Sequence, residues 1–255
     1  MRAMRSLLAG AALALSLAAT PALAAGDVVH PPKQNWSFNG IFGTVDLAAA
    51  QRGLHVYQEV CAACHGMKQL YYRHLTGIGL SEEQVKAFAA AITVPRGLND
   101  QGEPIEGPAL PSSRFKAPWP NETAARARYN GAVPPDLSVI IKAREGGADY
   151  MYALMTGYAD PPAGMQMGEG MHYNKYFPGH QIAMPPPLMD DKVEYADGTK
   201  ATVDQMARDV TQFLTWAANP EMVERKRIGI RVILFLILMT AVTYIAKRKV
   251  WSSLH

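Results

Sequence analysis

The sequence predicts a mainly α-helical domain with long loop insertions, followed by one C-terminal transmembrane helix. Three features lead to this prediction. Several segments combine a helix start signal with a periodic apolar face, whereas the alternation typical of strands is rare. Glycine (21 residues) and proline (18 residues) are frequent, which favours long connections shaped by turns. One run near the C-terminus is apolar all round, as in a helix surrounded by lipid.

Five segments of the central region have helical patterns. They are residues 45–60, 81–92, 136–144, 148–156 and 201–220. Ser81 with Gln84, and Thr202 with Gln205, have the spacing of capping boxes, in which two side chains satisfy the first backbone N–H groups of a helix. Gly53 weakens the first segment, because glycine is a poor helix former.

The remaining stretches predict loops. Residues 95–135 are rich in proline and glycine and predict a long structured loop. A second irregular stretch runs over 159–191. Residues 192–201 contain Asp197-Gly198, a dipeptide typical of tight turns, and predict one small hairpin.

The N-terminal residues 1–24 have the layout of a secretory signal peptide. Arg2 and Arg5 precede an apolar run over 7–17, and Ala22-Leu23-Ala24 provides small residues for cleavage. The alternative, a first transmembrane helix, requires a longer apolar run. We therefore expect cleavage at this end and a mature domain in a bacterial periplasm.

The C-terminal apolar run, 228–246, has 19 residues and one charge, Arg231, near its start. About 20 apolar residues span a bilayer, and a basic cluster flanks the run on each side. We expect a periplasmic domain over 25–224, a single membrane anchor over 225–248 in the inner membrane, and a cytoplasmic tail over 249–255. The anchor would contact membrane lipid.

Charge is unevenly distributed along the chain. The net charge is +3, but nine basic residues lie in the two terminal segments, which contain no acidic residue. The region between them has 16 basic and 22 acidic residues, a balance of about −6. Nucleic-acid binding normally requires the opposite sign. An acidic body suits a basic partner, although an acidic surface that only confers solubility is the simpler explanation.

Both cysteines of the chain lie in "YQEVCAACHGMK", as Cys61 and Cys64, directly before His65. This pattern is the attachment signature of a c-type haem, in which two thiols bond the porphyrin and the histidine ligates the iron. A structural disulfide fits a three-residue step poorly, and no βαβ pattern indicates a redox dithiol. A zinc site needs four ligands, and there is no second cysteine pair. We predict one covalent haem c.

The sixth iron ligand determines the chemistry of such a haem. An open position allows peroxidase or oxygen chemistry, whereas a thioether closes it and leaves electron transfer. Candidate thioethers are Met165, Met167 and Met171 in a glycine-rich loop, and Met184 before three prolines. The residues alone leave the choice open.

Several blocks resemble the cytochrome c1 family, the haem subunit of the quinol–cytochrome c reductase (cytochrome bc1 complex). They are "CAACHGMK", "GAVPPDLSVIIKAREGGADYMYALMTGY", "YFPGHQIAMPPPLMDD" and "VTQFLTWAANPE", followed by a terminal helix with basic flanks. The resemblance covers nearly all of the mature chain. It implies a cytochrome c-like helical haem domain with long loop insertions.

The resemblance also assigns roles to individual residues. It implies that Cys61 and Cys64 hold the haem and that His65 and Met184 are the axial ligands of the iron.

Residues of the haem pocket also follow from the resemblance. It implies that Arg144 neighbours a haem propionate, and that Tyr150 and Pro135 line the pocket. The alternative for Arg144 is an exposed charge at a helix C-terminus. Some members have an extra disulfide; this chain has no spare cysteine, so the loop near 159–180 is expected to depend on packing alone.

The implied function is a one-electron relay from the Rieske iron–sulfur protein, beside cytochrome b, to a cytochrome c. The chain would be no enzyme on its own, but a subunit of an oxidoreductase complex. The pairs Glu82-Glu83 and Asp190-Asp191 are candidate docking residues. Two alternatives are another membrane-anchored monohaem cytochrome, such as an oxidase subunit, and a peroxidase-like haem enzyme.

Overall fold

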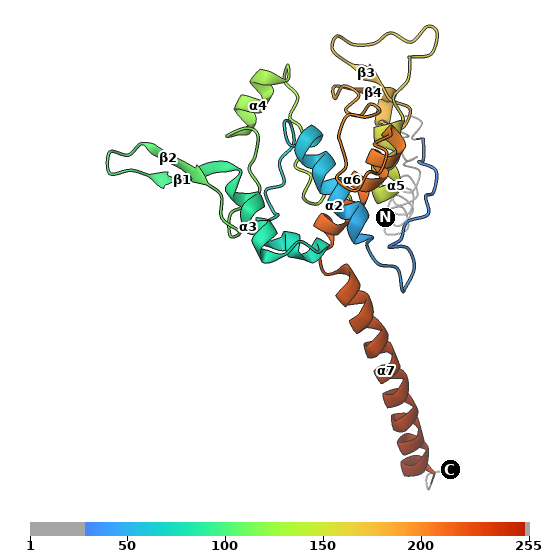
Figure 1. Cartoon of the computed structure of the whole chain (residues 1–255). Helices are drawn as coiled ribbons and strands as arrows, with labels where there is room; N and C mark the ends of the chain where they lie inside the picture. The colour runs from blue at the N-terminus through green and yellow to red at the C-terminus, as the bar shows by residue number, and fades with distance from the viewer. Residues whose placement is uncertain (1–28, 253–255) are drawn as a thin grey trace, which may run out of the picture.

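The computed structural model describes residues 29–252. The predicted signal peptide lies outside this range. The described chain forms a helical body from which one long helix, α7, projects freely, with the C-terminus at its far end (Figure 1). This arrangement confirms the predicted fold class, a mainly helical domain with one apolar C-terminal helix.

The body contains five α-helices: α2 Leu47–Val56, α3 Glu82–Ala90, α4 Glu122–Arg128, α5 Gly147–Thr156 and α6 Val203–Ala218. Shorter turns are a π-helical turn, Tyr57–Cys61, and 3₁₀ segments at Tyr72–Ile78 and Pro178–His180. Two antiparallel pairs make up the described strands: β1 Thr93–Leu98 with β2 Pro104–Pro108, and β3 His172–Tyr173 with β4 Gln181–Ile182. The helix α7 is Met222–Trp251.

Helices α2 and α6 lie side by side at the centre of the body and cross at Gly53 (Figure 1). A Cβ atom on Gly53 would lie 2.0 Å from the backbone oxygen of Asp209 and 2.8 Å from Cβ of Phe213. Only glycine allows the two backbones to approach so closely. Gly53 therefore lowers the helix propensity of α2 but allows α2 to pack closely against α6.

Aromatic side chains fill the core between these helices and the 3₁₀ segment. Tyr72 and Phe115 stack with ring centroids 4.6 Å apart, and Tyr57 lies against both Phe115 and Phe213 at about the contact distance of paired rings. Tyr57, Tyr72 and Phe213 are at most 2% exposed. This core supports the chain directly before Cys61.

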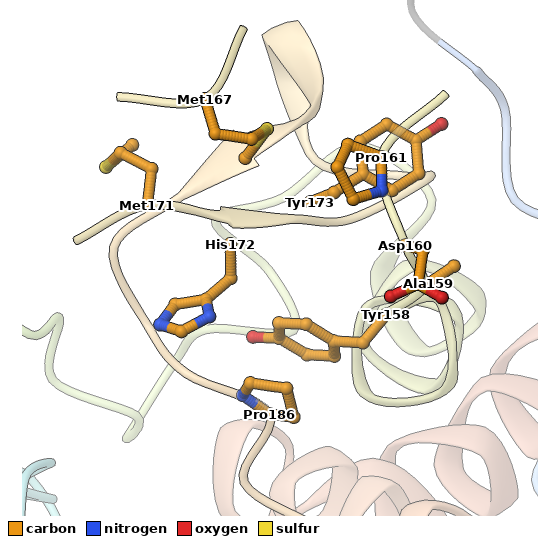
Figure 2. A pocket seen from close by; sticks show the side chains of 9 residues that line it. All are labelled: Tyr158, Ala159, Asp160, Pro161, Met167, Met171, His172, Tyr173 and Pro186. Carbon is orange, nitrogen blue, oxygen red and sulfur yellow. The ribbon is translucent and has the colours of Figure 1, made fainter. Parts of the chain in front are cut away.

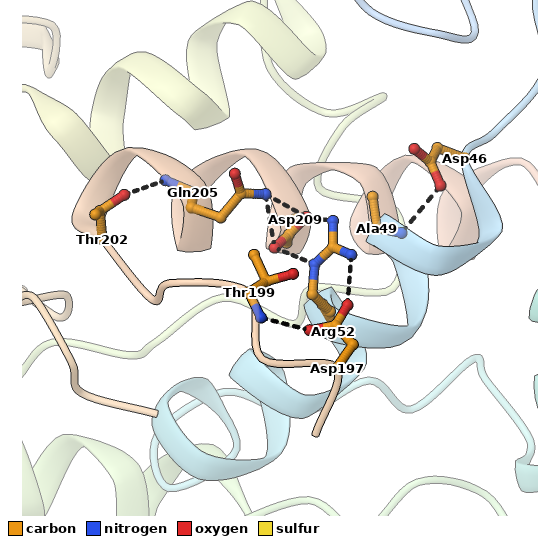
Figure 3. A network of polar contacts seen from close by, with 8 residues as sticks. All are labelled: Asp46, Ala49, Arg52, Asp197, Thr199, Thr202, Gln205 and Asp209. Atoms are coloured by element: carbon orange, nitrogen blue, oxygen red, sulfur yellow. Dashed lines mark hydrogen bonds and ion pairs between the residues drawn. The ribbon is translucent and has the colours of Figure 1, made fainter. Parts of the chain in front are cut away.

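A buried ion pair joins the same two helices (Figure 3). Arg52 on α2 donates from Nε and Nη2 to the two carboxylate oxygens of Asp209 on α6, each at 2.9 Å. Asp209 is fully buried, and Gln205 donates to it as well. The hydrogen bond and charge of Asp209 raise the pKa of Arg52. Arg52 also reaches Asp197 at 3.0 Å, which fixes the loop before α6.

The predicted capping box is confirmed at α3, whereas only one of its two hydrogen bonds forms at α6. Ser81 and Gln84 form both bonds of the box. Thr202 accepts from the backbone N–H of Gln205, but the side chain of Gln205 turns to Asp209 instead of closing the box.

The prediction of one long loop over 95–135 is wrong in part. Residues 95–135 contain most of the β1–β2 hairpin and all of α4. The hairpin lies almost wholly exposed, so its strands lack the apolar alternation that marks a half-buried strand. A register irregularity between Pro95 and Gly97 further hides the pattern.

Two further predictions are wrong. Residues 136–144 form turns instead of a helix, because Asp136 and Ser138 form hydrogen bonds with the segment after His65. Helix α5 begins only after Gly146, whose φ is +81°. Residues 192–201 form no strand pair, because Asp197 turns to Arg52 and to the backbone of Thr199.

Helix α7 meets the length and composition needed to cross a membrane. Its most apolar window of 18 residues has a mean hydropathy of 2.3, and none of that window is buried against the body. It extends three residues further toward the N-terminus than the anchor predicted from the sequence.

Replacing Gly53 with alanine should separate α2 from α6, because the new Cβ has no space. We expect Gly53→Ala to lower the free energy of unfolding by about 2–3 kcal/mol, as in overpacked cores. Gly229→Ala is the control, since a Cβ there meets nothing within 4 Å. Equal stability of the two variants in denaturant unfolding would contradict the close crossing.

Replacing Asp209 with asparagine should leave the guanidinium of Arg52 without its buried counter-charge. We expect Asp209→Asn to cost about 3 kcal/mol of unfolding free energy, because one member of a buried pair loses its partner. Glu224→Gln removes an exposed partner of Arg227 and should change stability by at most about 0.5 kcal/mol. The two variants are compared by chemical unfolding of the full chain. If Asp209→Asn loses no more unfolding free energy than Glu224→Gln, the ion pair does not stabilise the fold.

Candidate functional site

The end of α2 builds the turn that presents the Cys61–His65 motif. The helix widens into the π-helical turn, in which the N–H of Ala62 bonds the carbonyl of Tyr57 at 2.8 Å. The N–H groups of Cys64 and His65 then both bond the carbonyl of Cys61. Tyr57 donates from its hydroxyl to the carbonyl of His65 at 3.1 Å. The buried core thus holds both ends of the turn, and π-helical turns of this kind are frequent at functional sites.

The imidazole of His65 is oriented by a backbone carbonyl. Its Nδ1 lies 2.8 Å from the carbonyl oxygen of Pro135. A carbonyl only accepts, so Nδ1 is the protonated nitrogen and Nε2 keeps its lone pair. Burial lowers the pKa of His65, against the opposing effects of the Pro135 bond and the charge of Asp136. At neutral pH the ring is therefore uncharged, with Nε2 available.

Residues 135–138 dock on the chain that follows His65. Asp136 accepts the N–H of Lys68 at 2.8 Å, and the hydroxyl of Ser138 accepts the N–H of Gln69 at 3.0 Å. The N–H of Leu137 donates to the carbonyl of Gly66 at 2.8 Å. These bonds fix the position of the Pro135 carbonyl.

Cys61 and Cys64 both carry free thiols. Burial, together with the charge of Cys64, raises the pKa of Cys61 to about 12, so its thiol stays protonated at neutral pH. The hydroxyl of Tyr129, just after α4, donates to Sγ of Cys64 at 3.1 Å. The structure brings the two thiols and the His65 ring to one turn, beside Pro135.

Met184 lies on a segment that is held by β-strand pairing and by a tyrosine hydroxyl. The segment follows β4, which pairs with β3, and the hydroxyl of Tyr158 donates to the carbonyl of Met184 at 3.0 Å. Met184 is half-buried and packs against the hydrophobic core, as does Cys61. Both ends of the predicted site therefore border one core.

Two of the other candidate methionines are not among the side chains that pack against this core. Met167 and Met171 line an open cavity of about 480 Å³ around β3, together with His172 and Tyr173 (Figure 2). Tyr158 and Pro186 close the other side of this cavity. Their position on the outer loop distinguishes them from Met184, which packs against the core.

Arg144 and Tyr150 flank the start of α5. Arg144 is exposed, and its Nη1 donates to the carbonyl of Ala143 at 3.0 Å. Burial raises the pKa of Tyr150, while the nearby charge of Arg144 opposes that shift. The alternative of a charge at a helix C-terminus is wrong, because residues 136–144 form no helix.

The loop near 159–180 depends on more than packing. Asn174 is fully buried, donates to the carbonyl of Leu154 at 2.8 Å, and accepts from the N–H of Tyr176. The side chain of Gln181 accepts the N–H of Gly168 at 2.9 Å. Hydrogen bonds from two amide side chains therefore order a loop that has no disulfide.

Three tyrosines of the site escaped the sequence-based prediction: Tyr57, Tyr129 and Tyr158. The hydroxyl of each tyrosine donates a hydrogen bond to a predicted site residue, either to its side chain or to its backbone carbonyl. In the sequence, Tyr57 is only the first residue of the segment "YQEVCAACHGMK", and Tyr158 is only the last residue of a resembling block. Their partners lie 8, 65 and 26 residues away, so no local spacing could reveal them.

The residues present fit a haem of the c type. A neutral histidine keeps one nitrogen free to bind iron, and two free thiols lie within four residues of it. The fold and this site fit a mainly helical haem protein, and one helix of the described chain is apolar and long enough to cross a membrane.

The comparisons with known proteins identify the family. The model of the cytochrome C1 family matches residues 36–254, and the chain belongs to this family. It is 52% identical over 225 residues to "Cytochrome c1-2, heme protein, mitochondrial" of Solanum tuberosum, which covers 88% of this chain and 86% of that protein. It is 45% identical over 235 residues to "Cytochrome c1" of Rhodospirillum rubrum, covering 86% of each.

A third relative is named after its complex. The chain is 45% identical over 238 residues to "Cytochrome b-c1 complex catalytic subunit, mitochondrial" of Candida albicans, which covers 93% of this chain and 83% of that protein. Family membership makes this chain a haem-bearing electron-transfer subunit of the cytochrome bc1 complex.

Proposed function

We propose that the chain carries one covalent haem c that receives an electron from a Rieske iron–sulfur protein and passes it to a cytochrome c. The observation that carries this proposal is the orientation of His65, whose Nδ1–H is engaged by the Pro135 carbonyl beside two free thiols. That arrangement suits a permanent iron ligand.

The two thiols and the histidine would hold the haem on its proximal side. Cys61 and Cys64 would form the covalent bonds, and His65 would supply Nε2 to the iron. When bound, the haem supplies a one-electron redox couple. The protein's part is to keep its ligands still, and the hydrogen bonds of residues 135–138 with residues 66–69 serve that purpose.

Met184 would supply the sixth ligand. Its segment is restrained by Tyr158 and by three following prolines, which reduce the freedom lost on ordering a loop. A thioether in this position favours the reduced haem and excludes added ligands, which suits a carrier. Arg144 would neighbour a haem propionate, with Tyr150 beside it.

The partners follow from this role. Cytochrome b and the Rieske protein would be the neighbours within the complex, and a basic cytochrome c would dock on the acidic body. The body would lie in the periplasm of a bacterium, with α7 as a single-pass anchor in the inner membrane. The apolar surface of α7 supports the anchor, and the acidic charge balance supports a basic partner. The signal-peptide layout of residues 1–24 supports the periplasmic orientation.

The axial ligand is tested with Met184→Leu, which keeps the volume of the side chain but removes the sulfur. We expect the haem to stay attached to the denatured chain, while the midpoint potential falls by on the order of 0.1 V or more. A reduced-minus-oxidised spectrum and a redox titration measure both effects.

Met167→Leu is the matched control, because this methionine lines the outer cavity. Its spectrum and potential should equal those of the unchanged protein. If Met167→Leu lowers the potential and Met184→Leu does not, the ligand assignment is wrong. If the haem leaves the denatured chain, the covalent attachment is wrong.

Docking of the acceptor is tested by salt. We expect the second-order rate of electron delivery to a basic cytochrome c to fall about tenfold between about 0.02 M and about 0.3 M salt, because ions screen the attraction. The double variant Glu82→Gln, Glu83→Gln in the first turn of α3 should weaken this dependence. A rate that does not change with ionic strength refutes electrostatic docking.

A further inference from the structure

The loop 37–44 carries the most exposed aromatic side chain among the exposed large apolar residues of the described chain. Phe42 is 82% exposed, and its neighbour Ile41 is 68% exposed. Adjacent apolar side chains at a loop tip are costly in water. Their exposure therefore indicates a surface that another phase or molecule covers.

The base of this loop is rigid. Trp36 is buried and donates from its indole nitrogen to Asp149 on α5 at 2.7 Å. The hydroxyl of Ser37 accepts from the side chain of Gln212 on α6 at 2.8 Å, and the carbonyl of Ser37 accepts the N–H of Thr44 at 3.0 Å. The loop is thus a closed structure fixed to the body, and its apolar tip has little freedom to fold inward.

Lys226 ties the loop to the first turns of α7. Its Nζ donates to three backbone carbonyls of the loop: Phe38 at 2.7 Å, Gly40 at 2.8 Å and Gly43 at 2.9 Å. An ammonium has three N–H donors, so the loop uses all of them. A Cβ on Gly43 would lie 2.0 Å from the carbonyl oxygen of Asn39, so the tight shape of the loop requires glycine there.

The hydrogen bonds of Lys226 fix the position of the loop along the axis of α7. Lys226 lies two residues before Ile228, the first residue of the apolar run, which is about 3 Å along a helix axis. Arg225 and Arg227 flank it, and basic residues at such a position contact lipid headgroups. Figure 1 shows the loop reaching down beside the start of α7.

We propose that the tip of this loop, Ile41 and Phe42, inserts into the outer boundary of the membrane between headgroups and acyl chains. The proposal rests on the proposed membrane crossing of α7. Aromatic and aliphatic side chains bind this boundary, where their apolar parts leave water. The loop would be a second contact with lipid, which restrains the tilt of the body about the start of α7.

The proposal is tested by photo-crosslinking of the full chain in phosphatidylcholine vesicles and in native membranes. The photoreactive residue benzoylphenylalanine replaces Phe42 in one variant and Phe235, in the middle of α7, in another. A third variant carries it at Leu98, which is 66% exposed and belongs to β1. The β1–β2 hairpin projects sideways from the body (Figure 1). Mass spectrometry identifies the adducts.

We expect lipid adducts at positions 42 and 235 in both membranes, and none at position 98. Adducts at 235 without any at 42 overturn the loop proposal and leave the membrane anchor intact. If 235 yields no lipid adduct in the vesicles, the proposed anchor fails, and the loop proposal fails with it. A protein adduct that dominates at 42 in native membranes overturns the lipid contact in favour of a protein partner.

The attachment is tested separately with Lys226→Met in the variant labelled at Phe42. Loss of the three hydrogen bonds should reduce the lipid adducts at 42 about fivefold, the effect of about 1 kcal/mol. Arg225→Gln is the matched control, since it removes a neighbouring charge and leaves those bonds in place; its adducts should be unchanged. An equal reduction in both variants shows that charge, not attachment, places the loop.

Discussion

The close crossing of α2 and α6 at Gly53 is the constraint on which the rest of the structure depends. The backbone of α2 reaches the carbonyl of Asp209 there, and the Arg52–Asp209 ion pair fixes the same two helices one residue away. Helix α2 ends in the turn that presents Cys61, and α6 continues through Pro220 into α7. The packing of these two helices therefore connects the cysteine–histidine turn with the start of α7.

Rigidity is what an electron carrier needs from its protein. No bond to a substrate forms or breaks, so the site has no need of a mobile acid or base. The carbonyl of Pro135 orients the ring of His65. The residues that follow Pro135 form hydrogen bonds of their own, which fix the position of this carbonyl. Tyr57 packs against Phe115 and Phe213, and its hydroxyl donates to the carbonyl of His65.

The sequence predicted the parts of the fold that local chemistry determines. The helix around Gly53 and the cap at Ser81 could be predicted because periodicity and capping act within a few residues. The β1–β2 hairpin escaped because its strands are exposed on both faces. The cysteine–histidine motif is local, whereas Met184 followed only from the family resemblance. The contact between Tyr158 and the Met184 carbonyl depends on tertiary packing, which local spacing does not encode.

The exposed β1–β2 hairpin has a practical consequence. Its turn, closed by Asn99 with the N–H groups of Gln101 and Glu103, projects sideways from the body, away from the cysteine–histidine turn and from α7 (Figure 1). Loop tips with polar residues and few contacts tolerate added sequence. An affinity tag or a fluorescent label inserted between its strands would allow purification and imaging of the intact assembly without disturbing electron flow.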